Sequence, residues 1–63
     1  MDIQLIWEEL RIDGSVIIGK RRKDGKWDAR TYVILKELRE LASKNGIAVE
    51  FDKEDGSATL IEV

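Results

Sequence analysis

The sequence predicts a small, mostly β domain of the α+β class, a five-stranded antiparallel barrel with one helix, ordered strand, strand, strand, helix, strand, strand. Asp-Gly pairs at 13–14, 24–25 and 55–56 lie between runs rich in β-branched and aromatic residues, as is typical of hairpin turns. Apolar residues follow helical spacing near 34–45. A chain of 63 residues is expected to form a single domain, 1–63.

The curvature of a barrel is predicted from the first two strands. The first, near residues 3–12, puts five of its apolar residues on one face only if Glu8-Glu9 holds one extra residue, a β-bulge that bends the strand. Gly19 in the second strand marks a bend or a close approach of two backbones. A bulge and a glycine in facing strands favour a sheet that curls. The residues on the shared face would be Ile3, Leu5, Trp7, Leu10 and Ile12.

Two of the predicted strands have helical competitors. The first element also fits an amphipathic helix whose apolar stripe is Ile3, Ile6, Trp7 and Leu10. Residues 26–33 alternate as a third strand, with Trp27 and Ala29 inward and Arg30 outward, but Asp28 is also a suitable helix N-cap. The strand is preferred because Thr-Tyr-Val-Ile is a poor helix former and a helix would place Val33 on its polar face.

The last three elements follow from simpler patterns. A helix is predicted from Ile34 to Asn45, and Gly46 is suited to the position just beyond its end. The last two strands are expected to pair around a three-residue loop, 54–56. The facing pairs would be Ile47 with Val63, Val49 with Ile61, and Phe51 with Thr59.

This order of elements resembles the OB-fold, a five-stranded barrel with a helix between its third and fourth strands. The alternative is a two-layer ββαββ sheet with one helix across its face. The chain has no Pro, Cys or His, and its turns are built from repeated Asp-Gly pairs. Together with a helix rich in Lys, Glu and Leu, these choices resemble those of de novo designed mini-proteins.

The composition argues against catalysis and against a metal or cofactor. Without Cys and His, the chain cannot form a disulfide or a Cys/His zinc site, and it lacks the commonest general bases and nucleophiles. Ser15, Ser43 and Ser57 lie beside turns or at a helix end, where serine usually serves local hydrogen bonding. The apolar runs are too short to span a bilayer. We therefore expect no enzyme activity, cofactor, metal site or membrane partner.

The charge is unevenly distributed. The net charge of the chain is −2, yet residues 20–33 carry +4, while residues 46–63 carry −4. Such a concentration of cations is what binding to phosphates requires. The candidate nucleic-acid-binding residues are Lys20, Arg21, Arg22, Lys23, Lys26 and Arg30.

Residues 23–30, Lys-Asp-Gly-Lys-Trp-Asp-Ala-Arg, resemble the β-hairpin of the arm-DNA-binding domains of tyrosine recombinases. Those domains carry a Gly-Lys/Arg-Trp-x-Ala-Arg stretch on a three-stranded sheet that enters the major groove. The resemblance implies that Gly25 forms the turn, that Trp27 and Ala29 are core, and that Lys26 and Arg30 face DNA. It covers about a dozen residues, and the family ends with its helix, whereas this chain continues with residues 47–63.

The sequence therefore supports two main hypotheses of function, and a third is a protein-interaction module whose acidic C-terminal hairpin edge meets a basic partner. The first is a compact, monomeric scaffold domain, designed and without catalytic activity or partner, whose cations keep an exposed hairpin soluble. The second is a small nucleic-acid-binding domain that acts through the basic hairpin at 20–30.

Overall fold

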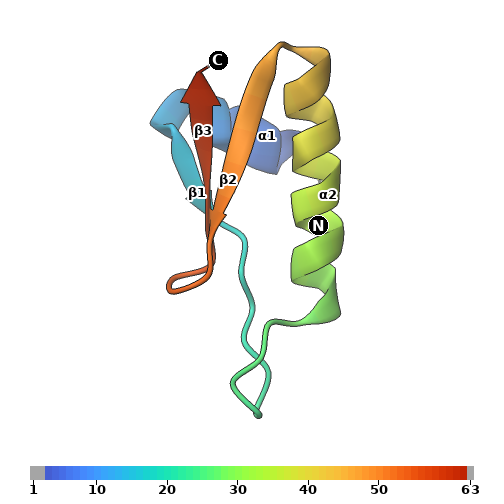
Figure 1. Ribbon diagram of the computed structural model, residues 1–63, viewed down its shortest axis with the longest axis vertical. Coiled ribbons are helices and arrows are strands. Elements are labelled where there is room, and N and C mark those ends of the chain that lie inside the picture. Colours follow the sequence, from blue (N-terminus) through green and yellow to red (C-terminus); the bar gives the residue numbers. More distant parts are fainter. Residues whose placement is uncertain (1–2, 63) are drawn as a thin grey trace.

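Two helices cover one face of a three-stranded antiparallel sheet in the computed structural model, which describes residues 3–62 (Figure 1). The predicted five-stranded barrel is wrong, because the sheet is open and holds three strands. The ββαββ alternative is wrong too, since the order is αβαββ. The elements are α1 (Ile3–Asp13), β1 (Ser15–Ile17), α2 (Ala29–Lys44), β2 (Ile47–Asp52) and β3 (Ser57–Glu62).

The first element is the helical competitor, α1, and not a bulged strand. Its buried side chains are Ile6, Trp7 and Leu10, which fall on one stripe at helical spacing. Leu5, expected on the inner face of a strand, is 65% exposed, whereas Leu10 is fully buried. The bulge expected at Glu8-Glu9 does not form, and both residues lie on the exposed face of this helix.

The third predicted strand is also helical, since α2 begins at Ala29. Asp28 is its N-cap, and the Asp28 carboxylate accepts a hydrogen bond of 2.8 Å from the backbone N–H of Arg30. Val33 does lie on the exposed side, 57% accessible, and the helix tolerates it because Thr31 and Leu35 are buried on the opposite side. The cap and the burial of one face outweigh the poor helix propensity of Thr-Tyr-Val-Ile.

The end of α2 was predicted almost to the residue. The helix ends at Lys44 with Asn45 as its C-cap, and Gly46 follows with a φ of 70°. A positive φ is unfavourable for residues with a Cβ, which explains the glycine at this position.

The sheet has β3 at its centre, with β1 and β2 on either side. The β2–β3 pairing differs by one residue from the expected register: Val49 lies opposite Leu60, and Phe51 opposite Ala58. This register turns Ala58 and Leu60 toward the helices, while Thr59 lies on the exposed face. The expected partner of Ile47, Val63, lies outside the described residues.

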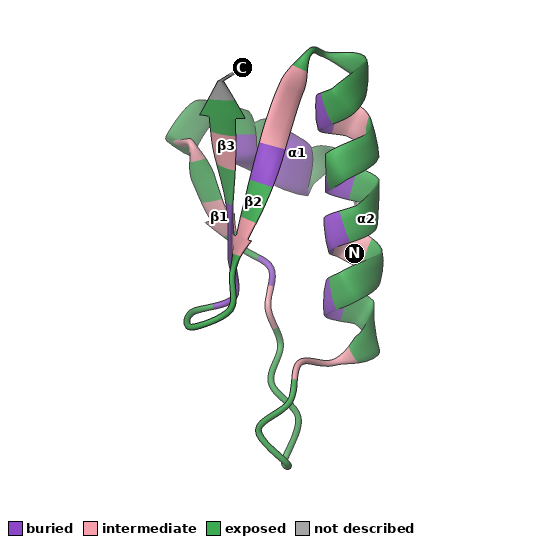
Figure 2. Cartoon of the chain, in the orientation of Figure 1, coloured by how far each residue is buried: buried purple, intermediate pink, exposed green. Residues whose placement is uncertain are grey.

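The core lies between the sheet and the two helices (Figure 2). It joins α1, α2 and all three strands into one cluster, and the opposite face of the sheet remains open, with Ile17 73% exposed. The fully buried apolar side chains are Leu10, Leu38, Ala42 and Ala58. So small a core makes each of these contacts important for stability.

A matched pair of substitutions tests the helical assignment of α1. Leu10→Ala is expected to lower the free energy of unfolding by about 2–5 kcal/mol, because it leaves a cavity in the core. Leu5→Ala should lower it by less than about 0.5 kcal/mol, because that side chain is exposed. Urea unfolding followed by circular dichroism measures both. Equal losses would contradict the orientation of α1.

Candidate nucleic-acid interface

The segment 20–28, termed here the basic hairpin, connects β1 to α2 and projects at one end of the long axis of the molecule (Figure 1). An antiparallel bridge joins Arg21 to Trp27. Within it, the N–H of Arg22 donates to the carbonyl of Lys26 at 2.7 Å, and the N–H of Gly25 donates to the carbonyl of Arg22 at 3.0 Å. The Asp-Gly turn predicted at 24–25 is therefore confirmed, with a φ of 84° at Gly25.

The root of the basic hairpin is a crossing of two backbones. The N–H groups of Ile18 and Gly19 both donate to the carbonyl of Gly56, at 2.9 and 2.8 Å. A Cβ added to Gly19 would lie 2.6 Å from the Cα of Gly56 and 2.7 Å from Cζ3 of Trp27. The close approach predicted at Gly19 is confirmed, and it joins the basic hairpin to the β2–β3 loop rather than curling a barrel.

Trp27 fills the junction at this crossing. Its six-membered ring packs on Gly19 and Gly56, and its edge meets Phe51 of β2, with ring centroids 5.9 Å apart and an interplanar angle of 76°. Trp27, expected to be core, is half-buried and lies outside the core cluster, which it approaches through Phe51. Ala29, expected to be core, is exposed in the first turn of α2.

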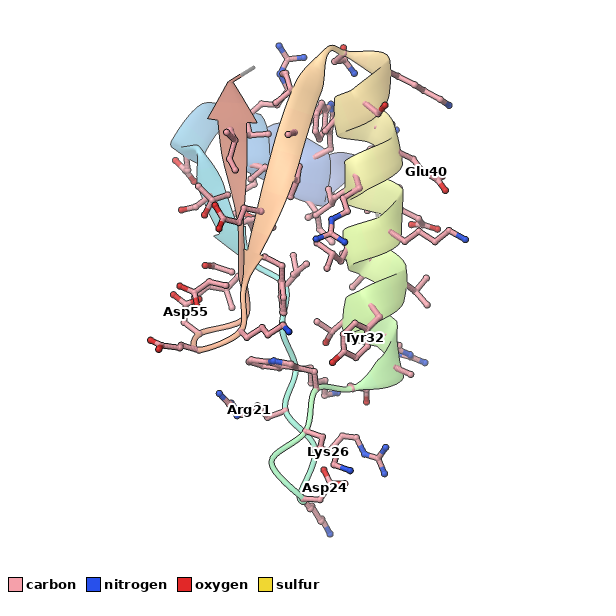
Figure 3. All side chains as sticks on the ribbon, viewed as in Figure 1. Arg21, Asp24, Lys26, Tyr32, Glu40 and Asp55 are labelled. Atoms are coloured by element: carbon pink, nitrogen blue, oxygen red, sulfur yellow. The ribbon has the colours of Figure 1, made fainter. Side chains whose placement is uncertain are left out.

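Arg21 makes three contacts at this junction (Figure 3). Its guanidinium carbon lies 4.3 Å from the centroid of the Trp27 ring. Nη1 donates to the carbonyl of Gly25 at 3.1 Å, and Nη2 donates to the carbonyl of Glu54 in the β2–β3 loop at 2.9 Å. Arg21 therefore connects the hairpin turn, the indole ring and the β2–β3 loop.

Arg21 is exposed, and so are the other five candidate cations: Lys20, Arg22, Lys23, Lys26 and Arg30. Within residues 3–62, the structure has one ion pair, between Arg22 and Asp24 at 3.9 Å. A pair that long and that exposed contributes little to stability. The hairpin therefore presents most of its positive charge to solvent.

Arg30 lies on α2, and not on a third strand as predicted. It nevertheless lies near Lys20: both residues line one surface groove between segment 18–20 and α2. The backbone N–H of Lys20 donates to Oγ1 of Thr31 at 3.0 Å, and its carbonyl accepts from the N–H of Asp28 at 2.7 Å. These hydrogen bonds hold Lys20, where the chain enters the hairpin, against the start of α2.

The two carboxylates of this region bind backbone amides. Asp24 accepts from the N–H of Lys26 at 3.0 Å, which supports the turn, and Asp28 caps α2. Both reduce the net charge, but neither covers the exposed lysines at the tip. The net charge of the basic hairpin therefore remains positive.

The neighbouring β2–β3 loop is acidic and closes on itself. Asp52 accepts from the N–H of Glu54 at 2.8 Å. Asp55 accepts from the hydroxyl and the N–H of Ser57 at 2.7 and 3.0 Å, and these hydrogen bonds, the hydroxyl's first, lower the pKa of Asp55 below its ordinary value of 3.8. Between residues 3 and 62, no group of three or more acidic side chains is arranged to hold a metal ion.

The comparisons with known proteins add no relative. Neither the protein-family models, nor the curated proteins, nor the solved structures contain a match to this chain. In the described part of the chain, neither helix has both the length and the apolar character needed to cross a bilayer.

Sequence reasoning missed two members of this site. Thr31 is nearly completely buried, and its hydroxyl oxygen accepts a hydrogen bond from the N–H of Lys20. The sequence signal for it was a polar β-branched residue three positions after the N-cap. Glu54 contributes its backbone carbonyl to Arg21 from 33 residues away. A contribution from the backbone leaves no trace in the residue type, so no sequence signal could have found it.

The backbone crossing predicts a specific intolerance at Gly19. Gly19→Ala is expected to lower the free energy of unfolding by about 1–3 kcal/mol, because its Cβ would overlap backbone atoms that cannot move aside cheaply. It should also shift the NMR resonance of the Trp27 indole N–H. Gly14→Ala is the control. A Cβ there strains the backbone, because φ is 81°, but meets nothing within 4 Å, so the Trp27 resonance should not shift. Wild-type stability in Gly19→Ala would refute the crossing.

The hydrogen bonds to Asp55 predict a pH dependence. Because the pKa of Asp55 is lowered in the folded state, these bonds contribute stability above its ordinary value of 3.8, and this contribution is lost as the pH falls through the lowered pKa. Ser57→Ala should raise the pKa of Asp55, as measured by an NMR titration of its carboxyl carbon. Ser43→Ala, on the exposed side of α2, should leave that titration unchanged. An unshifted pKa in Ser57→Ala would contradict the role of the hydroxyl.

Proposed function

We propose that this chain binds nucleic acid through the phosphate backbone, using the basic hairpin and the adjoining start of α2. The observation that carries the proposal is that, besides Arg21, five exposed cations lie on the basic hairpin, which projects from one end of the molecule, and on the adjoining first turn of α2. They are Lys20, Arg22, Lys23, Lys26 and Arg30. Only Arg22 has an acidic partner within 4.0 Å among the described residues.

Phosphate binding explains why positive charge gathers on one hairpin of an acidic chain. Each cation that neutralises a phosphate releases condensed counterions, so affinity depends on how many can engage one backbone together. Lys23 and Lys26 are exposed in the hairpin, and Lys20 and Arg30 both line the groove beside its root, together with Glu37. Cations are therefore present from the hairpin to the first turn of α2.

The resemblance to the recombinase arm domains supports the same ligand. Its stretch coincides with the observed hairpin, Gly25 does form the turn, and a helix follows. The resemblance implies that Lys26 and Arg30 face DNA, and both are exposed. The position of Ala29 on the surface departs from it.

The competing proposal is a non-catalytic, designed scaffold that acts as a monomer. Its specific support is that Arg21, Asp24 and Asp28 are engaged in holding the hairpin and α2 together. In that case, the remaining cations serve solubility and prevent edge-to-edge association.

Fluorescence anisotropy with labelled single- and double-stranded oligonucleotides, at about 50 and 200 mM salt, separates these proposals. The wild type should bind with a Kd of micromolar order at the lower salt, and its affinity should fall with a log–log slope of about −4 for four to five phosphate contacts. Replacing Arg22, Lys23 and Lys26 together by Gln should abolish binding. Arg21 stays in place, so the hairpin keeps its structure.

A matched control removes as many cations from the exposed side of α2. The triple change of Lys36, Arg39 and Lys44 to Gln lowers the net charge equally but leaves the hairpin untouched. It should preserve most of the affinity. Equal weakening by both triple variants would show general attraction by charge and would overturn the assignment to the hairpin. No binding by the wild type at the lower salt would leave the scaffold proposal in place.

A further inference from the structure

Arg21 differs from the other cations of the basic hairpin in what its guanidinium does. All six candidate cations are exposed, and of the other five only Arg22 has an ionic partner among the described residues. Arg21 stacks on Trp27 at 4.3 Å and uses two of its nitrogens on the carbonyls of Gly25 and Glu54. Although Arg21 is itself exposed, its guanidinium already contacts the Trp27 ring and two of its N–H groups already bind carbonyls of the same chain.

The surface on which Arg21 rests is anchored in the domain. Trp27 packs on Gly19 and Gly56, where the two backbones cross, and its edge contacts Phe51 of β2. Arg21 lies over this ring and reaches the β2–β3 loop through the carbonyl of Glu54. The hairpin is therefore held to β2 by the indole ring of Trp27 and to the β2–β3 loop by the guanidinium of Arg21, and the two groups contact each other within the hairpin.

This combination of contacts requires an arginine. The guanidinium is planar, stacks on an aromatic face and directs its N–H groups in a fixed fork, so one group can meet the ring and two separate carbonyls. The ammonium of lysine is a single, strongly hydrated nitrogen and cannot reproduce the stack and the fork together. An Arg-to-Lys change thus keeps the positive charge but loses the combination of the ring contact with the two hydrogen bonds to carbonyls.

We propose that Arg21 is a positioning residue that holds the basic hairpin at a fixed angle to the β2–β3 loop, so that the other cations meet one phosphate backbone together. The part that concerns binding rests on the function proposed above. The hairpin has a single bridge, Arg21 to Trp27, and its tip lies away from the core. A hairpin already held in its bound orientation loses less conformational entropy when it binds.

The first experiment concerns the free protein and needs no ligand. Hydrogen exchange of the amides of Arg22 and Asp28, which donate across the hairpin to Lys26 and Lys20, reports how often the hairpin opens. Arg21→Lys should accelerate both exchanges several-fold. Unchanged exchange in this variant overturns the proposal, whether or not the protein binds nucleic acid.

The chain offers a matched control in Arg11. Its guanidinium carbon also lies over a tryptophan ring, 5.7 Å from the centroid of Trp7, but on α1 and outside the basic hairpin. Arg11→Lys makes the same chemical change at a second Arg–Trp contact. It should leave the exchange of Arg22 and Asp28 at the wild-type rate, and acceleration there would show a general loss of stability and overturn the local role of Arg21.

The second experiment measures oligonucleotide binding by the same variants. Arg21→Lys should raise the Kd by about five- to tenfold, because orientation is lost, and should leave the salt slope unchanged, because the number of charges is unchanged. Arg11→Lys should bind as the wild type does. Wild-type affinity in Arg21→Lys would mean that only the charge of Arg21 counts, which overturns the positioning role in binding. Absence of binding by the wild type refutes the proposed function, and the exchange experiment still decides whether Arg21 orders the hairpin.

Discussion

The contact between Gly19 and Gly56 is the constraint on which the position of the hairpin depends. Two backbones approach so closely there that neither residue could carry a Cβ without displacing the other chain or the ring of Trp27. The carbonyl of Gly56 accepts both N–H groups of the incoming segment, at Ile18 and Gly19. This crossing sets where the chain leaves the sheet, and hence where the cations lie relative to the body of the domain.

The domain is otherwise held by a small core to which both helices and the sheet contribute. Helix α1 provides Trp7 and Leu10, helix α2 provides Leu38, and β3 provides Ala58 at the centre of the sheet. Because the opposite face of the sheet is uncovered, one layer of helices must bury nearly all the apolar surface that folding removes from water. The basic hairpin lies beyond this core, so its order depends on local contacts. The hydrogen bond from Arg21 to the carbonyl of Glu54 and the contact of Trp27 with Phe51 join it to the rest of the domain.

Much of the candidate site was predictable from the sequence, because charge and turn chemistry are local properties. The six cations, the turn at Gly25 and the close approach at Gly19 all followed from residue type and spacing. Their spatial relations did not. Arg30 lies on a helix and shares a groove with Lys20, and Arg21 is bound to the carbonyl of Glu54, across a separation that no local pattern reports.

The sequence by itself determined the end of α2 at Gly46, the turn at Gly25 and the uneven distribution of charge, since these depend on backbone freedom and on ionisable groups. The hairpin turn expected at Asp13-Gly14 instead joins α1 to β1. Only the tertiary structure decided that residues 3–13 and 29–33 are helical. Both segments carry apolar residues that satisfy either periodicity, and the choice was made by what they could bury. As a helix, α1 places Trp7 and Leu10 together against α2 and the sheet, whereas a strand would have left them on opposite faces unless a bulge intervened.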